Sequence, residues 1–345
     1  MAPAYRYSWR VILIFRPSIT EMDAGYYLDS FLAPLAPFLA RGDVTDIYVN
    51  RPGEVWLETT GGRIEREDVA ALDEALLGRL ARQIAAAGSQ AISREHPLLA
   101  ATLPDGSRIQ IVRPPATRAG HVLAIRRHVA AAMSLDDWVE AKAFSMTSKS
   151  SRALDLVDEY HALDGQSAPC ALKDAVRARK NILISGGTST GKTTFLNALL
   201  AEIPSEERLI LIEDTEELRL VHDNAVGLLA ARGQTSEARI SAEDLLIAAL
   251  RMRPDRIILG ELRGIEAFTF LRAVNTGHPG SMTTIHADTP ERAVEQLALL
   301  VLQAGTKLGW DDVRHYARAS IDVFVQLGRE GGRRGVAQVL VRGAS

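Results

Sequence analysis

The sequence predicts an α/β protein with two domains, a mixed α+β domain followed by a domain with a mainly parallel sheet around a phosphate-binding loop. The chain has 345 residues, too many for one small core at roughly 150 residues per domain. In its second half, short apolar strand-like runs alternate with helical stretches, the pattern of a parallel sheet covered by helices. A Gly-x4-Gly-Lys-Thr string follows one of these runs and opens a helix, as phosphate-binding loops do.

Shifts in composition along the chain indicate the domain boundaries. Residues 22–128 contain turn chemistry between strand-like runs and form the expected amino-terminal domain. Residues 129–172 are rich in Ala, Ser, Asp and Lys with weak periodicity, so we interpret them as an interdomain linker. Residues 173–345 form the expected carboxy-terminal domain. The first domain should contain strands at 44–50 and 54–58, an amphipathic helix at 68–87, and strands at 96–103, 107–112 and 122–127.

The second domain should alternate strands with helices. Pro204, Pro254 and Gly277 mark helix ends, and Thr289 before Pro290 is typical of a helix start. We expect strands at 182–184, 209–212, 257–259 and 282–285, helices at 193–202, 242–252, 266–275 and from Pro290, and a final hairpin of 321–327 with 336–341.

Composition argues against several classes of function. The formal net charge is −3, without the basic excess needed to bind many phosphates of DNA or RNA, so we expect no strong nucleic-acid binding. The single Cys170 allows no intramolecular disulfide and no multi-thiolate metal site, which favours the cytoplasm. The apolar stretch at 11–15 is far short of the ~20 residues of a membrane span, and we interpret it as an edge strand or a ragged terminus rather than a signal peptide.

The phosphate-binding loop is the strongest functional signal. It comprises Gly186, Gly187, Thr188, Ser189, Thr190, Gly191, Lys192 and Thr193, and Thr194 follows on the helix. Successive backbone amides and the helix N-terminus form a positive concavity that suits the phosphates of ATP. Lys192 should reach the terminal phosphates, and the Thr193 hydroxyl should bind Mg²⁺.

Hydrolysis also needs groups that polarise water and help to hold the metal. Ligands of a parallel sheet lie at the carboxyl ends of its strands. Glu213 with Asp214 follows one apolar run and Glu261 follows another, so these two clusters compete for the two roles. His286 follows a third run, and its near-neutral pKa suits it either to sense the γ-phosphate or to orient water.

In this order, the motifs resemble those of the secretion ATPase superfamily of type II secretion, type IV pili and type IV secretion. Residues 186–193 are similar to its Walker A motif, 212–218 to its aspartate box, 257–261 to its Walker B motif and 277–287 to its histidine box. The strings at 251–263 and 103–108 resemble the branch that powers type IV secretion and conjugation. The resemblance runs from about residue 28 to residue 341, and it implies a RecA-like fold for the second domain.

The resemblance implies a homohexameric ring at the cytoplasmic face of the inner membrane. Such a ring binds inner-membrane components of a secretion machine, with peripheral membrane association, and uses ATP hydrolysis to drive DNA or protein transfer and pilus biogenesis. Glu261 then activates water and Glu213 assists the metal and the water. The implied Mg²⁺ ligands are Thr193, Glu213 and Asp214, partly through water.

The resemblance also implies that nucleotide lies between the domains, with arginines of the first domain at its phosphates. The candidates are Arg108, Arg113, Arg126 and Arg127. Because side chains alternate along a strand, Arg108 and Arg113 cannot both face one phosphate. We prefer Arg108, which ends a Pro-Asp-Gly-x-Arg motif, with Arg126 or Arg127 as its companion; such an arginine contributes about 10³-fold in rate. Arg263 is a further candidate for the phosphate network.

One departure from the family pattern lies in the loop, where Ser189-Thr190 replaces the common Gly-Ser. A backbone torsion that only glycine adopts easily would cost ~1–2 kcal/mol at Ser189. We therefore expect altered nucleotide affinity rather than lost activity.

Other motors and switches share the phosphate-binding loop. A type II secretion ATPase commonly has a four-cysteine zinc site, which the single Cys170 excludes. A pilus assembly or retraction motor fits the same chemistry and ranks lower only on the strings at 251–263 and 103–108. A hexameric helicase would need an aromatic and basic strand-binding segment that is absent here, and a nucleotide switch without turnover would not need Glu261.

Overall fold

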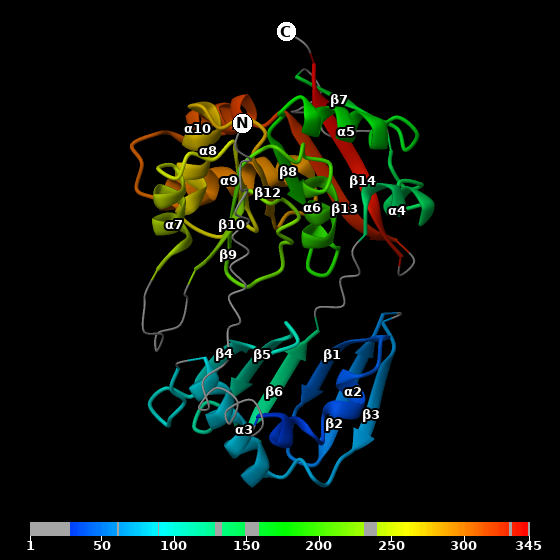
Figure 1. Ribbon diagram of the computed structural model, residues 1–345, viewed down its shortest axis with the longest axis vertical. Helices are drawn as coiled ribbons and strands as arrows, with labels where there is room; N and C mark the ends of the chain where they lie inside the picture. The colour runs from blue at the N-terminus through cyan, green and yellow to red at the C-terminus, as the bar shows by residue number, and fades with distance from the viewer. Residues whose placement is uncertain are drawn as a thin grey trace, which may run out of the picture.

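Two separate β-sheets organise the protein, as the computed structural model in Figure 1 shows. The structure describes residues 28–60, 62–88, 90–127, 133–148, 159–230, 240–330 and 333–343. The apolar stretch at 11–15, interpreted as an edge strand or a ragged terminus, and the first residues of the expected amino-terminal domain lie outside these ranges. Within them, no helix has the length and apolar character needed to cross a membrane.

The smaller sheet has six antiparallel strands in the order β3-β2-β1-β6-β5-β4. These are β1 (Val44–Val49), β2 (Glu54–Thr59), β3 (Ile64–Asp68), β4 (Leu98–Thr102), β5 (Arg108–Val112) and β6 (Val122–Arg126). The short helix α2 (Ala36–Leu39) lies near β1, and the sheet shares one hydrophobic core with the longer helix α3 (Glu74–Ala87).

Helix α3 begins later than the helix predicted at 68–87. Its N-cap is Asp73, whose carboxylate accepts a hydrogen bond from the Leu76 amide at 2.7 Å, as N-cap residues do. Asp68 instead ends the edge strand β3, which we did not predict. That strand reads Ile-Glu-Arg-Glu-Asp and is mostly exposed, so it has neither the apolar alternation nor the buried face that identifies most strands.

The larger sheet has eight strands in the order β10-β9-β11-β12-β8-β13-β14-β7. All pairings from β10 to β13 are parallel, whereas β14 pairs antiparallel with both neighbours, so the sheet is mixed. The strands are β7 (Tyr160–Ala162), β8 (Ile182–Ser185), β9 (Leu209–Glu213), β10 (Ala225–Leu229), β11 (Arg256–Leu259), β12 (Met282–Ile285), β13 (Val323–Glu330) and β14 (Arg333–Arg342).

Helices cover both faces of this sheet (Figure 1). One core contains residues of α7 (Ala242–Ala249), α8 (Glu266–Asn275), α9 (Pro290–Gln303) and α10 (Trp310–Ser320). The other contains residues of α4 (Leu135–Glu140), α5 (Ala168–Arg177) and α6 (Lys192–Leu200). Strand β9 shows the consequence, because Leu209 and Leu211 face one core while Ile210 and Ile212 face the other. A strand buried on both sides reads as a continuous apolar run.

The segment predicted as a linker, 129–172, differs from the observed structure. It contributes α4, β7 and the first turns of α5 to the body around the larger sheet. Trp138 packs edge-on against Phe195 of α6, with ring centroids 5.0 Å apart. Strand β7 has three residues and α4 has six, too few to produce a periodic pattern that a sequence reading can detect. The edge strand β10 and the polar helix α10 were also missed.

Candidate nucleotide-binding site

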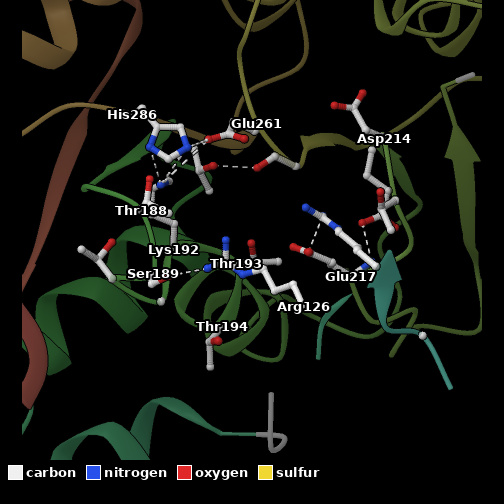
Figure 2. Close-up of a pocket in the computed structure, with 18 of the residues that line it drawn as sticks. Arg126, Thr188, Ser189, Lys192, Thr193, Thr194, Asp214, Glu217, Glu261 and His286 are labelled. Atoms are coloured by element: carbon white, nitrogen blue, oxygen red, sulfur yellow. Dashed lines mark hydrogen bonds and ion pairs between the residues drawn. The ribbon is translucent and has the colours of Figure 1, made fainter. Parts of the chain in front are cut away.

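The two sheets meet at a cavity of about 540 Å³ at the carboxyl ends of β8, β9, β11 and β12 (Figure 2). The smaller sheet contributes Arg108, Arg126 and Arg127, and the larger sheet contributes the phosphate-binding loop and Arg263. The cavity also contains predicted site residues from three strand ends: Glu213, Asp214, Glu261 and His286. Parallel strands place their following loops at one edge of a sheet, which is why these separated motifs converge.

The loop after β8 folds tightly onto itself. A Cβ atom on Gly186 would lie 2.5 Å from Oγ1 of Thr190, so this position accepts only glycine. Gly191 has φ +95° and precedes α6. Ser189 has φ +60°, the left-handed region predicted to carry a cost at this position, where a side chain is disfavoured by ~1–2 kcal/mol. Thr190 Oγ1 donates to the Gly187 carbonyl at 2.9 Å.

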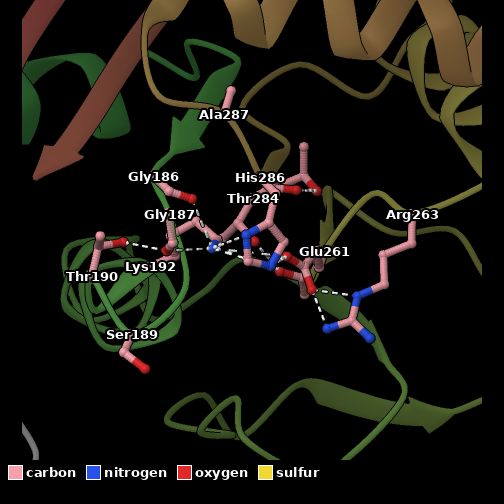
Figure 3. Close-up of polar contacts among 12 residues, drawn as sticks. Gly186, Gly187, Ser189, Thr190, Lys192, Glu261, Arg263, Thr284, His286 and Ala287 are labelled. Carbon is pink, nitrogen blue, oxygen red and sulfur yellow. Dashed lines mark hydrogen bonds and ion pairs between the residues drawn. The ribbon is translucent and has the colours of Figure 1, made fainter.

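Lys192 occupies the centre of the site (Figure 3). Its Nζ donates to the carbonyl oxygens of Gly186 at 3.0 Å and Gly187 at 3.2 Å. The same atom lies 3.2 Å from His286 Nδ1 and 3.9 Å from Glu261 Oε1. Burial lowers the pKa of Lys192, and the Glu261 carboxylate opposes that shift. A buried ammonium held mainly by neutral acceptors is a strong binder of anions, because a phosphate is a better partner than a carbonyl.

His286 connects Lys192 to Glu261. Its Nε2 lies 2.7 Å from Glu261 Oε1, while Nδ1 faces the lysine ammonium. Burial lowers the pKa of His286, so the neutral ring predominates at pH 7. In that form Nδ1 accepts a hydrogen bond from Lys192, and Nε2 lies beside the Glu261 carboxylate, so the ring stands between the two charged groups.

Glu261 follows β11 and is paired on both sides. Besides the histidine, it pairs with the Arg263 guanidinium, which also lies 3.4 Å from Asp214 Oδ2. Gly260 permits this arrangement, since a Cβ atom there would approach Glu213 Cβ to 3.2 Å. The ends of β9 and β11 therefore lie close enough to present both acidic clusters to one cavity.

Glu213 is almost completely buried, with 9% of its surface exposed. Its Oε2 accepts hydrogen bonds from the backbone amides of Glu217 at 2.8 Å and Leu218 at 2.9 Å. Burial raises its pKa to about 7, although the two amides act in the opposite direction. A cation bound at this carboxylate would favour its ionised form.

The predicted Mg²⁺ ligands Thr193, Glu213 and Asp214 all line the cavity. Across the described ranges, no three His, Cys, Asp or Glu side chains lie close enough to hold a metal by themselves. One hydroxyl and two carboxylates nevertheless fit Mg²⁺, which binds one or two protein carboxylates and completes its shell with phosphate and water oxygens.

The arginines of the smaller sheet divide into two groups. Arg108 and Arg126 are directly opposite each other on β5 and β6, and both line the cavity. Arg108 forms an ion pair with Glu217, and Arg126 donates to Oγ of Ser189. Arg127 also lines the cavity, but its guanidinium donates to the Val44 carbonyl at 3.0 Å and to that of Arg41. The geometry therefore favours Arg126 as the companion of Arg108.

Arg113 does not reach this site and is a correction to the predicted set. It follows the far end of β5, where its amide donates to the Pro97 carbonyl at 3.0 Å, and it is absent from the cavity lining. Gly186 and Gly187 do not line the cavity either, although their carbonyls hold Lys192. The other predicted residues of the loop, from Thr188 to Thr194, do line it.

The sequence reading missed several residues of the cavity. Asp46 and Thr45 come from β1, and Arg334 comes from the hairpin of β13 and β14. The arginine-rich turn before Arg334 was visible in the sequence but indicated only a hairpin. Nothing in its local pattern shows that the hairpin lies beside the phosphate-binding loop.

The sequence is similar to proteins of known secretion systems. The family model of the type II/IV secretion system protein matches residues 30–327. The type IV secretion system protein VirB11 of Bartonella henselae is 39% identical over 324 residues, which cover 89% of this chain and 91% of that protein. PtlH of Bordetella pertussis is 40% identical over 336 residues, covering 91% and 95%.

Solved structures show a similar fold. The pilus retraction motor PilT with bound ADP has a TM-score of 0.57 at 18% identity, covering 92% of this chain and 83% of that one. The ATPase DotB of Legionella pneumophila also has a TM-score of 0.57, at 16% identity, covering 92% and 81%. These likenesses indicate a mixed α/β fold of the same kind.

Proposed function

The chain belongs to the type II/IV secretion system protein family, and we propose that it hydrolyses ATP as the motor of a type IV secretion system. This proposal rests mainly on one observation. Lys192, Glu261 and His286 converge at one cavity. Arg108 and Arg126 from a second sheet line the same cavity. The relatives from Bartonella and Bordetella are named as type IV secretion proteins, which supports this branch of the family over a pilus motor.

The contacts of the site suggest how each residue acts. Lys192 exchanges the carbonyls of Gly186 and Gly187 for the terminal phosphates of ATP. His286 loses one partner and keeps Glu261 in place, and the freed Glu261 carboxylate accepts the hydrogen bond of the attacking water. Neutral His286 does not compete with this carboxylate for a proton, since its own pKa is lowered.

The remaining charges stabilise the transferred phosphoryl group. Arg108 and Arg126 face the cavity from the smaller sheet and neutralise charge that develops in the transition state. Thr193, Glu213 and Asp214 would hold Mg²⁺, partly through water, and a bound ion would supply positive charge to the phosphate oxygens. Because Arg108 and Arg126 come from another sheet, their approach couples turnover to movement of that sheet.

We also propose a two-domain division. The smaller sheet has a hydrophobic core of its own, separate from the two cores of the larger sheet. This supports an amino-terminal domain that ends near Arg127 and a RecA-like domain that begins before α4, with a shorter connection than predicted.

Family membership supports a homohexameric ring at the cytoplasmic face of the inner membrane, bound to membrane components of the secretion machine. Apolar side chains at the β10 edge are compatible with a subunit contact, because Leu220, Val221 and Leu229 are each more than half exposed. Mass measurement of the intact particle with and without ATP tests for six subunits.

Phosphate release by the purified full chain tests the proposed activity. Lys192→Ala and Glu261→Gln should each reduce turnover by at least about 10²-fold, and Arg108→Ala by about 10³-fold. Arg113→Ala is the matched control, since it removes the same charge from the other end of β5 and should retain the wild-type rate. Equal rates for wild type and Lys192→Ala would refute the catalytic assignment. Strong stimulation by single-stranded DNA would favour a helicase.

A further inference from the structure

The hairpin of β13 and β14 extends past the edge of the larger sheet at which the cavity lies. Strand β13 runs parallel to β8, and Gln326 is opposite Ser185, the last residue of β8. From Leu327 onward, β13 pairs only with β14, up to Glu330 opposite Arg333. The hairpin thus continues in the direction of the phosphate-binding loop after β8 has ended.

Contacts confirm that the hairpin lies against the loop. A Cβ atom on Gly186 would be 3.2 Å from both Cβ and the carbonyl oxygen of Leu327. The Ser185 hydroxyl also donates to Oε1 of Gln326 at 2.5 Å. The projecting part of β14 then brings Arg334 into the lining of the cavity that contains Lys192 and Arg126.

Arg334 differs from Arg108 and Arg263, two other arginines of the cavity, in its partners. Arg108 and Arg263 are each paired with a carboxylate, whereas no carboxylate in the described part of the chain lies within 4.0 Å of the Arg334 guanidinium. Burial and the nearby charges of Arg329 and Arg126 lower the pKa of Arg334, and the weaker effects of Asp46 and Glu58 oppose this. The positive charges of Arg334 and Arg126 therefore lie near each other beside the loop, and Asp46 and Glu58 offset them only in part.

Strand order determines which part of a nucleotide this charge faces. Glu213 ends β9, and Glu261 and His286 follow β11 and β12; all three strands lie on one side of β8. The hairpin lies on the other side of β8. If the terminal phosphate faces the groups that activate water, the nucleoside end of the phosphate chain faces the hairpin.

We infer that Arg334 binds the phosphate chain of the nucleotide at its nucleoside end, as a second cation beside the loop. The inference rests on the proposed function, because it assumes that nucleotide occupies this cavity. An α-phosphate is present in both ATP and ADP, so Arg334 contributes to the affinity for both nucleotides. Arg108 and Arg126 differ, since they act on the terminal phosphate and the rate.

Binding of a fluorescent ADP analogue to the full chain, with competition by ADP and ATP, tests this inference. Arg334→Gln should weaken the binding of both nucleotides by about tenfold, the value of one charge-assisted hydrogen bond. Arg334→Lys keeps the charge and should lose about threefold. In steady-state hydrolysis, the KM for ATP should rise by more than kcat falls.

Arg333→Gln is the matched control. It removes the same charge from the adjacent position of β14, whose side chain points to the opposite face of the hairpin and does not line the cavity. Unchanged ADP binding by Arg334→Gln, or an equal loss in Arg333→Gln, would overturn the inference. A wild-type chain that binds no nucleotide and releases no phosphate would instead refute the proposed function. Circular dichroism of each variant checks that the fold is intact.

Discussion

The two ends of strand β11 carry similar ion pairs in different surroundings. At its amino end, Arg256 is fully buried and holds Glu207 through two hydrogen bonds of 2.8 Å and 2.7 Å. Its remaining nitrogen donates to the Val176 carbonyl at 2.7 Å. At the carboxyl end, Arg263 and Glu261 also pair, but Arg263 is 41% exposed and the pair borders an open cavity.

The difference separates a structural ion pair from a functional one. The donors of the Arg256 pair all have protein partners and water is excluded, so no donor is left to bind a ligand. At the carboxyl end, Lys192 donates to a backbone carbonyl. Glu261 has three charged or polar neighbours there: Lys192, Arg263 and His286. Those contacts are exchangeable. The residue types are the same at both ends, and burial with complete hydrogen bonding decides which pair belongs to the fold.

Glu207→Gln should produce the largest change in stability. Loss of the carboxylate leaves the Arg256 charge buried without a counter-ion, which costs about 3 kcal/mol or more. Glu261→Gln is the paired control, because its two nearest partners, Arg263 and His286, remain in contact with water and the free energy of unfolding should change by less than about 1 kcal/mol. Urea unfolding of both variants measures this, and equal losses would remove the distinction between the two ends.

The two ends also differ in how well the sequence predicts them. Glu213, Glu261 and His286 were predictable because each directly follows an apolar strand, and parallel strands bring such positions together. Glu207 and Arg256 are 49 residues apart, and their contact depends on the register that sets Arg256 opposite Leu209. No local pattern contains that register. Arg334 was missed for the same reason.

Element prediction failed where elements are short or polar. Strands 209–212, 257–259 and 282–285 were found, since burial on both faces makes them continuous apolar runs. The three-residue β7 and the exposed β3 have no such run. Their positions are fixed by neighbours that are distant in the sequence, and β7 lies within the segment that composition indicated as a linker.

The pH dependence of stability should have opposite signs for the two buried glutamates. Burial raises the pKa of Glu213 from 4.5 to about 7, so its contribution to stability is complete below pH 4.5 and is lost as the pH rises through 7. The hydrogen bond from Arg256 lowers the pKa of Glu207, so its contribution is present above pH 4.5 and is lost as the pH falls through the lowered value.

Glu213→Gln should therefore become more stable relative to wild type as the pH rises, by about 3 kcal/mol between pH 4.5 and roughly 7.5. The deficit of Glu207→Gln should shrink as the pH falls below 4.5. Urea unfolding at a series of pH values measures both trends. A Glu213→Gln difference that is independent of pH would show that this carboxylate is already ionised in the folded protein.

The smallest expected change in stability comes from relieving backbone strain. Arg179 near the amino end and Ser189 at the carboxyl end both have left-handed torsions, with φ +54° and +60°. Arg179 forms an ion pair with Glu207 at 3.0 Å, whereas the Ser189 hydroxyl accepts an exchangeable hydrogen bond from Arg126. Ser189→Gly removes a strain of ~1–2 kcal/mol from the folded state. Glycine also raises the entropy of the unfolded chain, which lowers the stability by about 0.5–1 kcal/mol.

Ser189→Gly should consequently stabilise the folded chain by about 0.5–1 kcal/mol relative to Ser189→Ala. The alanine variant is the matched control, because it loses the same hydrogen bond to Arg126 but keeps the strained torsion. Both variants should bind nucleotide with an affinity different from wild type, since each frees Arg126, whereas only the glycine variant should gain stability. If alanine and glycine were equally stable, the loop would hold no strain at Ser189, and its side chain would act through Arg126 alone.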